Sequence, residues 1–345
     1  MLKKDIRNQK SSQPLYIRLY EHLRHYIDSE NARKTGRLPT EMELCRIFGV
    51  SRNTVSQALS MLEEEQLICR IKHRGTFLSS AINEFDPQSI RRTIGVVFPF
   101  SSPWHNAITA IRKGCRELGY DFHLYSYIWE DRQDELFQIE RARKLSGGII
   151  LYPSYKGGAC EWLQSTQGSC PLVLFDLDVT GFECNLVATD HYQGAYTLVE
   201  FLIRRGCRRF CLLTDPRKIS SVKLRKAGFL QALEDHNIEH TSRDEWMDFN
   251  MEKFPDFLRN GNYDAILDTS KHMINNILPV RGLHLARFDV ATDQEKESFN
   301  VVLALQHFSA LGVNAINLMK SVMRSGMTPF RKILIAPEIH FIKLK

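Results

Sequence analysis

A chain of 345 residues has room for two or three domains, each large enough to bury a hydrophobic core. A content of 43% hydrophobic and 25% charged residues is that of a soluble globular protein and excludes a disordered or fibrous chain. The net charge of +6 is concentrated at the N-terminus, because residues 1–80 hold 14 Lys and Arg against 9 Asp and Glu, whereas residues 81–345 hold 32 against 31.

Membrane insertion and secretion are both disfavoured by the pattern of apolar residues. No apolar run approaches the ~20 residues that a membrane-spanning helix needs. The basic N-terminus, MLKKDIRNQKSSQP, lacks the apolar segment of a signal peptide. We therefore expect a cytoplasmic protein with no membrane partner.

The eight cysteines include no C-x-x-C pair. The closest two, Cys207 and Cys211, have no histidine or second pair at the spacing of a zinc site. Several cysteines lie within apolar runs. We interpret them as buried, reduced thiols and expect neither a metal nor another cofactor.

Three helices are predicted near the N-terminus. The first runs from Pro14 to about Asp28 with an apolar residue on nearly every turn. The second begins at Thr40, which forms a capping box with Glu43 three residues later. Gly49 then permits a tight turn before the third helix, for which the Ser51 side chain can accept hydrogen bonds from free backbone N–H groups.

The third helix has one apolar and one polar face. Val55, Leu59 and Leu62 fall on the apolar face. The polar face, near the helix N-terminus, carries Arg52, Asn53, Ser56 and Gln57. This is the layout of a recognition helix that reaches base edges in the major groove, although a surface hairpin of two helices with a solvated polar face gives the same pattern.

A short hairpin is predicted after this helix, from Ile68 to Ile71 and from Thr76 to Leu78. Its tip would carry Lys72, His73 and Arg74, which suit contact with the DNA backbone or minor groove. Gly75 suits a turn that needs positive φ. The basic excess coincides with this motif, where it would neutralise phosphates.

These segments resemble the winged helix-turn-helix of the GntR family of bacterial transcription regulators. The resemblance rests on PLYIRLYEHLRHYI, LPTEMELCRIFGVSRNTVSQALSMLEEEQLI and RGTFL, in the family's order and spacing. It implies a dimer that reads a palindromic operator with the recognition helix and the wing tip. The residues expected to contact DNA are Thr40, Ser51, Arg52, Asn53, Thr54, Ser56, Gln57, Lys72, His73, Arg74 and Gly75.

Two positions depart from the GntR pattern. Met42 and Ser56 stand where the family often has arginines that contact the operator. The operator sequence therefore cannot be taken from relatives. Arg52 is the remaining candidate for a bidentate contact to guanine.

The pattern changes after residues 81–92, which mix polar residues without periodicity and are interpreted as a linker. From Thr93 onward, strand-like runs such as TIGVVFPF, GGIILYPS and PLVLFDL alternate with helical ones, and the alternation restarts after Asp190. Repeated βαβ units predict parallel sheets covered by helices. The fold class is α/β: an N-terminal winged helix-turn-helix in residues 1–80, followed by two doubly wound subdomains in residues 93–345.

The cleft between these subdomains is the expected ligand site, because ligands bind beyond the carboxyl ends of parallel strands. Polar residues follow several strands, and hydroxyl-rich ligands need carboxylate acceptors, Arg and Gln donors and an aromatic face. A strand-end aspartate can equally cap a helix, and an aromatic can equally belong to the core. The candidates are Ser102, Trp104, Asp176, Asp190, Arg225, Ser270, Asp289 and Gln306.

Residues 93–345 resemble the periplasmic-binding-protein-like effector domain of the LacI/GalR family. The matching segments are TIGVVFPFSSPWHNAI, PLVLFD, VATDHYQGAYTLVEFLIRRGCRRFCLL, SSVKLRKAGFLQAL and ARFD. The resemblance implies that Asp176, Arg225, Asp289 and Gln306 line a pocket for a sugar or nucleobase. A GntR-type reader joined to such a domain resembles the architecture of bacterial arabinose repressors.

The cleft also departs from the LacI pattern. Ser270 and Lys271 replace the usual Asn-Asp pair, and Ser102 replaces a common Asn. A lysine that points into the cleft would suit an acidic or phosphorylated sugar, whereas one that points outward would leave the pocket unchanged. The altered pair also motivates a second interpretation, in which the sensor is vestigial and DNA binding does not respond to a ligand.

An enzyme is the remaining alternative. The sequence has no G-x-S-x-G, Walker A or H-E-x-x-H motif, and no G-x-G-x-x-G follows a strand. We therefore expect a transcription regulator rather than an enzyme. The family resemblance implies repression that is relieved by a small polar ligand, most simply a sugar.

Overall fold

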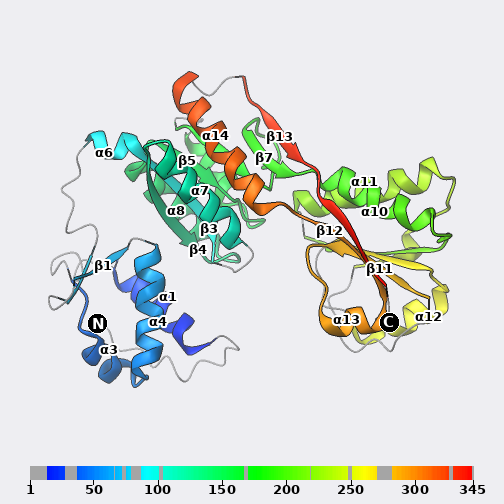
Figure 1. Cartoon of the computed structure of the whole chain (residues 1–345), viewed down its shortest axis with the longest axis horizontal. Helices are drawn as coiled ribbons and strands as arrows, with labels where there is room; N and C mark the ends of the chain where they lie inside the picture. The colour runs from blue at the N-terminus through cyan, green and yellow to red at the C-terminus, as the bar shows by residue number, and fades with distance from the viewer. Residues whose placement is uncertain are drawn as a thin grey trace.

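The computed structural model shows a small N-terminal domain beside two α/β subdomains (Figure 1). Among the described residues, no helix is both long and apolar enough to cross a membrane. The described residues are 14–27, 37–65, 67–71, 75–78, 87–100, 104–166, 170–217, 219–247, 251–269, 282–325 and 329–343.

The N-terminal domain contains the three predicted helices and the wing. Its elements are α1 (Leu15–Ile27), α3 (Glu41–Phe48), α4 (Arg52–Glu64) and the antiparallel strands β1 (Ile68–Ile71) and β2 (Gly75–Leu78). Thr40 and Glu43 form the expected capping box, and Ser51 accepts a hydrogen bond from the Thr54 amide. Gly49 adopts the left-handed conformation with φ of 62°, so each predicted start and stop of the helix-turn-helix is confirmed.

One apolar cluster holds this domain together. Fully buried side chains from all three helices meet the wing strands there. The core residues are Leu19, Tyr20, Leu23, Ile27, Leu38, Leu44, Phe48, Val50, Val55, Ala58, Leu59, Leu62, Leu67, Ile68 and Leu78.

The end of the predicted linker is helical. We expected residues 81–92 to have no regular structure, but α6 (Pro87–Arg92) leads directly into β3 (Thr93–Pro99). A six-residue helix completes fewer than two turns, so its sequence carries no readable period. The rest of the linker, residues 81–86, lies outside the described residues.

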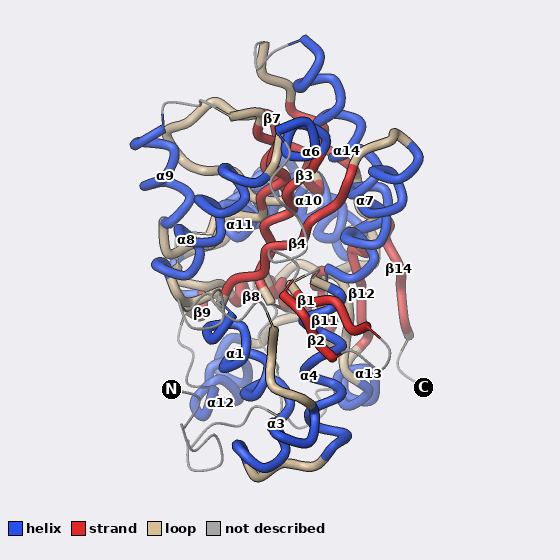
Figure 2. Tube along the Cα trace, turned by 90° about the vertical axis from the view of Figure 1, so that its left-hand side faces the viewer, coloured by secondary structure: helices blue, strands red, loops and turns tan. Residues whose placement is uncertain are grey.

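The first subdomain is built on a parallel six-stranded sheet, ordered β13-β7-β6-β5-β3-β4. Figure 2 shows helices α8 and α9 on one side of this sheet and α7 and α14 on the other. The additional strands are β4 (Asp121–Tyr127), β5 (Gly148–Leu151), β6 (Leu172–Phe175), β7 (Asn185–Thr189) and β13 (Lys332–Ile335). The helices are α7 (His105–Glu117), α8 (Arg132–Leu145), α9 (Gly158–Thr166) and α14 (Phe308–Ser325).

The second subdomain repeats this plan, with strand order β14-β12-β11-β10-β8-β9. Only β14 is antiparallel to its neighbour among the described pairs of this sheet. The strands are β8 (Phe210–Leu213), β9 (Glu245–Trp246), β10 (Ala265–Asp268), β11 (His284–Phe288), β12 (Asn300–Leu305) and β14 (Glu338–Ile342). Helices α10 (His191–Ile203) and α11 (Ser220–Asp235) cover one face, and α12 (Phe254–Gly261) and α13 (Asp293–Ser298) lie on the other. The helix expected near residues 272–278 lies outside the described residues.

The chain passes between the subdomains three times. The first passage joins β7 to α10, the second joins β12 to α14, and the third joins β13 to β14. The apolar C-terminal run RKILIAPEIHFIKL divides between the two sheets around Pro337. Proline cannot donate a ladder hydrogen bond, which favours a break at this position. The first subdomain is therefore completed only by α14 and β13, late in the sequence.

Helices α10 and α11 approach so closely that one glycine is required between them. A Cβ atom on Gly228 would lie 2.1 Å from the backbone oxygen of Tyr192. We expect Gly228→Ala to force the helices apart and lower the free energy of unfolding by ~1–3 kcal/mol. Urea denaturation of the full chain measures this change. Ala227→Ser, on the exposed side of the same helix, is the control, and equal stability of both variants would contradict the close approach.

Candidate functional site

The predicted DNA-reading surface is the polar face of α4. The Arg52 side chain is 83% exposed, and its Nε lies 3.2 Å from Glu41 Oε2 on α3. An exposed ion pair of this kind contributes little stability, so Arg52 can exchange Glu41 for a base or phosphate. Asn53 and Gln57 are also exposed, whereas Ser56 is half-buried.

Three of the predicted DNA contacts also have local structural roles. The Thr40 and Ser51 side chains cap α3 and α4, and the Ser51 and Thr54 hydroxyl oxygens lie 2.8 Å apart. These hydroxyls therefore orient the two helices whether or not they touch DNA. Gly75 has a φ of 112°, as the wing turn requires. The predicted tip residues Lys72, His73 and Arg74 lie outside the described residues.

The predicted ligand cleft has a carboxylate at the same position of each sheet. Asp176 follows β6 and Asp289 follows β11, which are equivalent strands in the two sheet orders. Both residues have left-handed backbone conformations, with φ of 61° and 66°, and both are buried. Such a conformation is uncommon for residues other than glycine and is often found at functional sites.

Gln306 bridges the two subdomains where β12 leads into α14. Its Nε2 donates to both carboxylate oxygens of Asp289 at 2.9 and 2.8 Å. Its Oε1 accepts a hydrogen bond of 2.8 Å from the Thr189 hydroxyl at the end of β7. Gln306 therefore connects the carboxyl ends of strands that belong to different sheets.

A second buried chain of polar groups joins Arg225 to Asp176. The Arg225 Nη1 donates to the Thr269 carbonyl at 2.8 Å, and its guanidinium lies 3.8 Å from the ring centre of Phe288. Arg225 Nε donates to His191 Nδ1 at 3.3 Å, and His191 Nε2 lies 3.3 Å from Asp176 Oδ1. Because Nδ1 accepts, the proton of a neutral His191 lies on Nε2 and faces the carboxylate.

The protonation states within this chain follow from burial and pairing. Burial lowers the pKa of His191, despite the neighbouring Asp176. Burial alone would raise the pKa of Asp176, but His191, the Thr189 amide and Arg225 together lower it below its usual value. We therefore treat Asp176 as a carboxylate that lies beside a neutral imidazole at physiological pH and accepts a hydrogen bond from the Thr189 amide.

Aromatic side chains line the same region. Trp104 is 7% exposed, and its ring centre lies 4.3 Å from that of Tyr152 and 5.3 Å from that of Phe308. The Trp104 Nε1 has no hydrogen-bond partner among the described residues. Burial and the nearby Asp176 raise the pKa of Tyr152, so its hydroxyl stays protonated and can donate.

The remaining sequence candidates are placed differently. Asp190 accepts a hydrogen bond of 2.9 Å from the Gln193 amide and caps α10, the structural role weighed against ligand binding for any strand-end aspartate. Ser102, Ser270 and Lys271 lie outside the described residues.

The sequence analysis missed His191, Thr189 and Tyr152. Thr189 ends a predicted strand and Tyr152 follows one. Asp176 and Asp289 were predicted to bind ligand because of this same placement. No sequence pattern pairs His191 with Arg225, 34 positions away.

The polar groups gathered between the two sheets are suited to a polar ligand. Two carboxylates and one guanidinium converge with amide, hydroxyl and aromatic groups. No group of three or more metal-ligating side chains occurs in the part of the chain that the structure describes. Carboxylates that accept, a guanidinium that donates and aromatic faces are suited to a hydroxylated ring.

Comparison with known proteins finds transcription regulators that are similar to the N-terminal domain and to the α/β subdomains. Residues 15–78 match the family described as bacterial regulatory proteins, gntR family. The arabinose metabolism transcriptional repressor of Geobacillus stearothermophilus is 29% identical over 232 residues, which cover 65% of this chain and 63% of that protein. The match thus spans less than two thirds of the relative's length.

Solved structures resemble the two α/β subdomains. Transcription regulator CcpA of Lactococcus lactis superposes with a TM-score of 0.60 at 18% identity, over 73% of this chain and 99% of that one. A periplasmic binding protein/LacI transcriptional regulator from Alkaliphilus metalliredigens QYMF, complexed with D-xylulofuranose, superposes with a TM-score of 0.55 at 18% identity, over 74% and 100%.

These matches confirm the predicted fold class. The N-terminal domain is a GntR-family helix-turn-helix domain, and the two α/β subdomains have the periplasmic-binding-protein fold of LacI-type regulators.

Proposed function

We propose that this chain is a transcription repressor whose affinity for operator DNA is set by a small polar ligand, a sugar, in the cleft. Residues 1–80 are the DNA-binding domain, residues 81–92 the linker and residues 93–345 the effector domain. One observation carries the proposal. The same chain has an exposed recognition helix and a proposed ligand cleft to which each sheet contributes one carboxylate.

The proposed DNA partner is a pseudo-palindromic operator bound by a homodimer in the cytoplasm. The exposed N-terminus of α4 and the basic excess of residues 1–80 support DNA binding. A dimer suits the palindrome because two-fold protein symmetry matches two half-sites. The relatives are transcription regulators rather than enzymes, which supports a role in binding without turnover.

The proposed ligand class follows from the chemistry of the cleft. Asp176 and Asp289 accept hydrogen bonds, Arg225 donates them, and Trp104 with Tyr152 offers aromatic surface. Hydroxylated rings use all three kinds of contact. The names of two similar proteins, an arabinose metabolism repressor and a regulator complexed with D-xylulofuranose, point in the same direction.

Ligand control works through the angle between the subdomains. Asp176 and Asp289 belong to different sheets, so a ligand that contacts both favours one closure state. The ligand shifts operator affinity only by the difference in its affinity for the two states. Closure would alter the placement of the two DNA-binding domains in a dimer and release the operator.

A thermal-shift screen of the full chain tests the ligand. We expect the melting temperature to rise with at least one member of a panel containing both enantiomers of arabinose, D-xylulose, other mono- and disaccharides, sugar acids and sugar phosphates. A saturating ligand at ~100 times its Kd stabilises the folded state by ~2.7 kcal/mol. A flat response across the panel would instead support the ligand-unresponsive alternative.

Arg52→Ala tests the DNA-reading role. If Arg52 contacts a guanine, its loss should weaken specific operator binding by ~1–3 kcal/mol and relax the preference at one base pair. Selection from a random DNA pool, followed by electrophoretic titration, measures both effects. The control is Arg46→Ala on the exposed side of α3, which should affect all sequences alike. An unchanged base preference in Arg52→Ala would refute the assignment.

A further inference from the structure

The loop between β4 and α8, residues 128–131, lies between the DNA-binding domain and the second α/β subdomain. Figure 1 and Figure 2 both place the N-terminal domain beyond the carboxyl end of β4. The same loop reaches the second subdomain through Glu130. The chain from Ile128 to Asp134 therefore contacts the DNA-binding domain through Asp134 and the second subdomain through Glu130.

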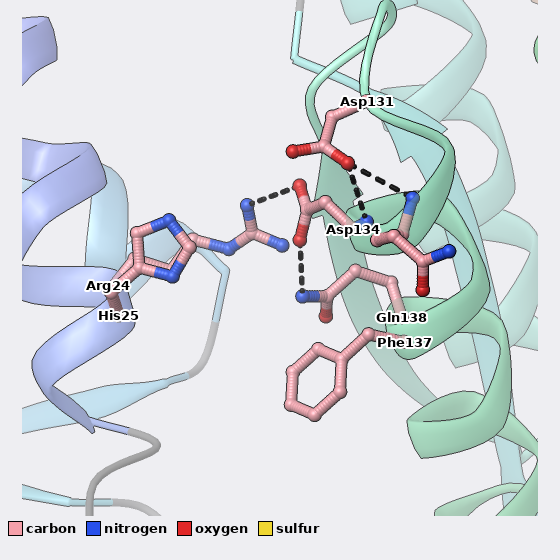
Figure 3. A pocket seen from close by; sticks show the side chains of 7 residues that line it. Arg24, His25, Asp131, Asp134, Phe137 and Gln138 are labelled. Atoms are coloured by element: carbon pink, nitrogen blue, oxygen red, sulfur yellow. Dashed lines mark hydrogen bonds and ion pairs between the residues drawn. The ribbon is translucent and has the colours of Figure 1, made fainter.

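In the DNA-binding domain, helix α1 packs against the first subdomain through buried groups. The fully buried ring of Tyr20 stacks on Phe100 with ring centres 4.9 Å apart, and its hydroxyl donates to Glu65. Arg24 is 5% exposed, and its Nη1 donates to Asp134 Oδ2 at 3.4 Å across the domain boundary (Figure 3). A crevice marks this boundary, and it is lined from both sides, by Arg24 and His25 of α1 and by Asp131, Gln133, Asp134, Phe137 and Gln138.

These contacts favour one arrangement of the two domains. Burial raises the pKa of Glu65, whereas Arg24 lowers it. The Arg24 side chain thus lies between Glu65, whose Oε2 is 4.0 Å from Arg24 Nε, and Asp134. Removing one partner of a buried charge is strongly destabilising, so the docked position of α1 depends on Asp134.

The Asp134 carboxylate also fixes the loop. Its Oδ2, which accepts from Arg24, accepts a second hydrogen bond of 2.8 Å from the Ile128 amide. Asp131 caps α8 by accepting from the amides of Gln133 and Asp134 at 2.9 and 3.0 Å. A displacement of the loop would therefore displace the acceptor that holds Arg24.

The β4–α8 loop also contacts one residue of the second subdomain. Arg217, in the segment after β8, is held by Asp215, to which its backbone amide and Nε donate at 2.8 and 2.9 Å. Its Nη1 lies 3.6 Å from Glu130 Oε1, and its guanidinium lies 5.0 Å from the ring centre of Tyr155. The Tyr155 hydroxyl donates to Glu130 at 3.1 Å, so Arg217 of the second subdomain contacts two linked residues of the first.

We propose that the β4–α8 loop couples closure of the two subdomains to docking of the DNA-binding domain, with Arg217 and Asp134, which contact the loop at Glu130 and at the Ile128 amide, as the two positioning residues. The proposal rests on the proposed function, since it supplies the route by which the ligand would act. The contact of Arg217 with Glu130, between the subdomains, and the contact of Arg24 with Asp134, between the domains, occur together in this structure. A ligand that favours closure therefore favours docking, and docking is the state with lower operator affinity.

Cross-linking across the crevice tests the coupling without any ligand. His25→Cys and Gln133→Cys place thiols on opposite sides of the crevice in the full chain, and a short bismaleimide joins them when α1 is docked. Mass spectrometry distinguishes this link from links to native cysteines. We expect Arg217→Gln to lower the initial rate of linking roughly fivefold, the lower end of coupling between sites, although Arg217 touches neither thiol.

Two further variants separate coupling from general damage. Asp134→Asn keeps an acceptor for the Ile128 amide but removes the charge facing Arg24, and it should slow linking by a similar factor. Arg132→Gln is the matched control, because the described ion pair of Arg132 is with Glu161 on α9 and involves neither the DNA-binding domain nor the Arg217–Glu130 contact. Linking that stays at the parent rate in Arg217→Gln would overturn the coupling, and equal slowing in Arg132→Gln would overturn the specific roles.

Operator titration with and without arabinose then connects the loop to regulation. In the parent protein, arabinose should lower operator affinity, whereas Arg217→Gln and Asp134→Asn should still show an arabinose-induced thermal shift but lose this change in affinity. An unchanged response in both variants would overturn the proposal. A parent protein that ignores every sugar would refute the proposed ligand, while the cross-linking rates would still decide whether the loop couples the two domains.

Discussion

Leu59→Ala should abolish operator binding by unfolding the DNA-binding domain, while the effector domain stays folded. Leu59 is fully buried at the centre of the only apolar cluster that we describe within residues 14–78. Truncating a buried leucine to alanine costs ~2–5 kcal/mol. A domain of this size is stabilised by only ~5 kcal/mol or slightly more, so the substitution removes most of its stability.

Thermal unfolding followed by circular dichroism, together with operator titration and sugar-induced thermal shift, measures this separation. The DNA-binding domain should melt below the temperature of the parent protein, and the sugar should still shift the second transition. Met42→Ala on the same domain is the control, because Met42 is 67% exposed and its truncation should change stability by less than about 0.5 kcal/mol. Simultaneous loss of sugar binding in Leu59→Ala would show that the two functions share one folding unit.

Asp289→Asn should weaken ligand binding while leaving ligand-free operator binding intact. Asp289 accepts both of its described side-chain hydrogen bonds from Gln306 Nε2 and lies at the carboxyl end of β11. Loss of a charged acceptor from a hydrogen bond costs ~1.5–3 kcal/mol, which corresponds to roughly 10- to 150-fold in Kd. Asparagine tolerates the left-handed backbone at this position better than alanine does, so Asp289→Asn isolates the charge from backbone strain.

Isothermal titration with the sugar that gives the largest thermal shift measures this effect. Asp190→Asn is the control, because Asn caps a helix as well as Asp does and Asp190 caps α10. Its ligand affinity should equal that of the parent protein. If Asp190→Asn weakens binding as much as Asp289→Asn does, Asp190 contacts the ligand, as predicted from its position at a strand end. Capping of α10 would then not be its main role. Unchanged affinity in Asp289→Asn would remove Asp289 from the ligand site.

The sequence predicted the DNA-binding domain almost completely because its determinants are local. The Thr40–Glu43 capping box, Gly49 and Ser51 each act within four residues of themselves. The strand ends that carry Asp176 and Asp289 were also predictable, because the alternation of strands and helices sets the edge at which parallel strands end.

Other parts of the site depend on contacts that no local pattern encodes. The Arg225–His191–Asp176 chain joins three elements, and its geometry depends on how α10 and α11 pack. The division of the C-terminal run between two sheets follows from the pairing of β13 with β7 and of β14 with β12. The contact between Arg24 and Asp134 spans 110 positions and joins two domains that the sequence treats separately.

Because α14 and β13 complete the first subdomain late in the sequence, the DNA-binding domain is synthesised before that subdomain is complete. Ribosomes add roughly 5–20 residues per second, so the wing emerges some 10–50 s before Ile335 is made. Leu311, Ile316 and Met319 of α14 belong to the core of the first subdomain, which stays incomplete during that interval. The DNA-binding domain has its whole core by Leu78. Each newly made molecule therefore passes through a period in which the DNA-binding domain can fold before the first subdomain is complete. Under the proposed function, synthesis interrupted late would leave a DNA-binding domain without ligand control.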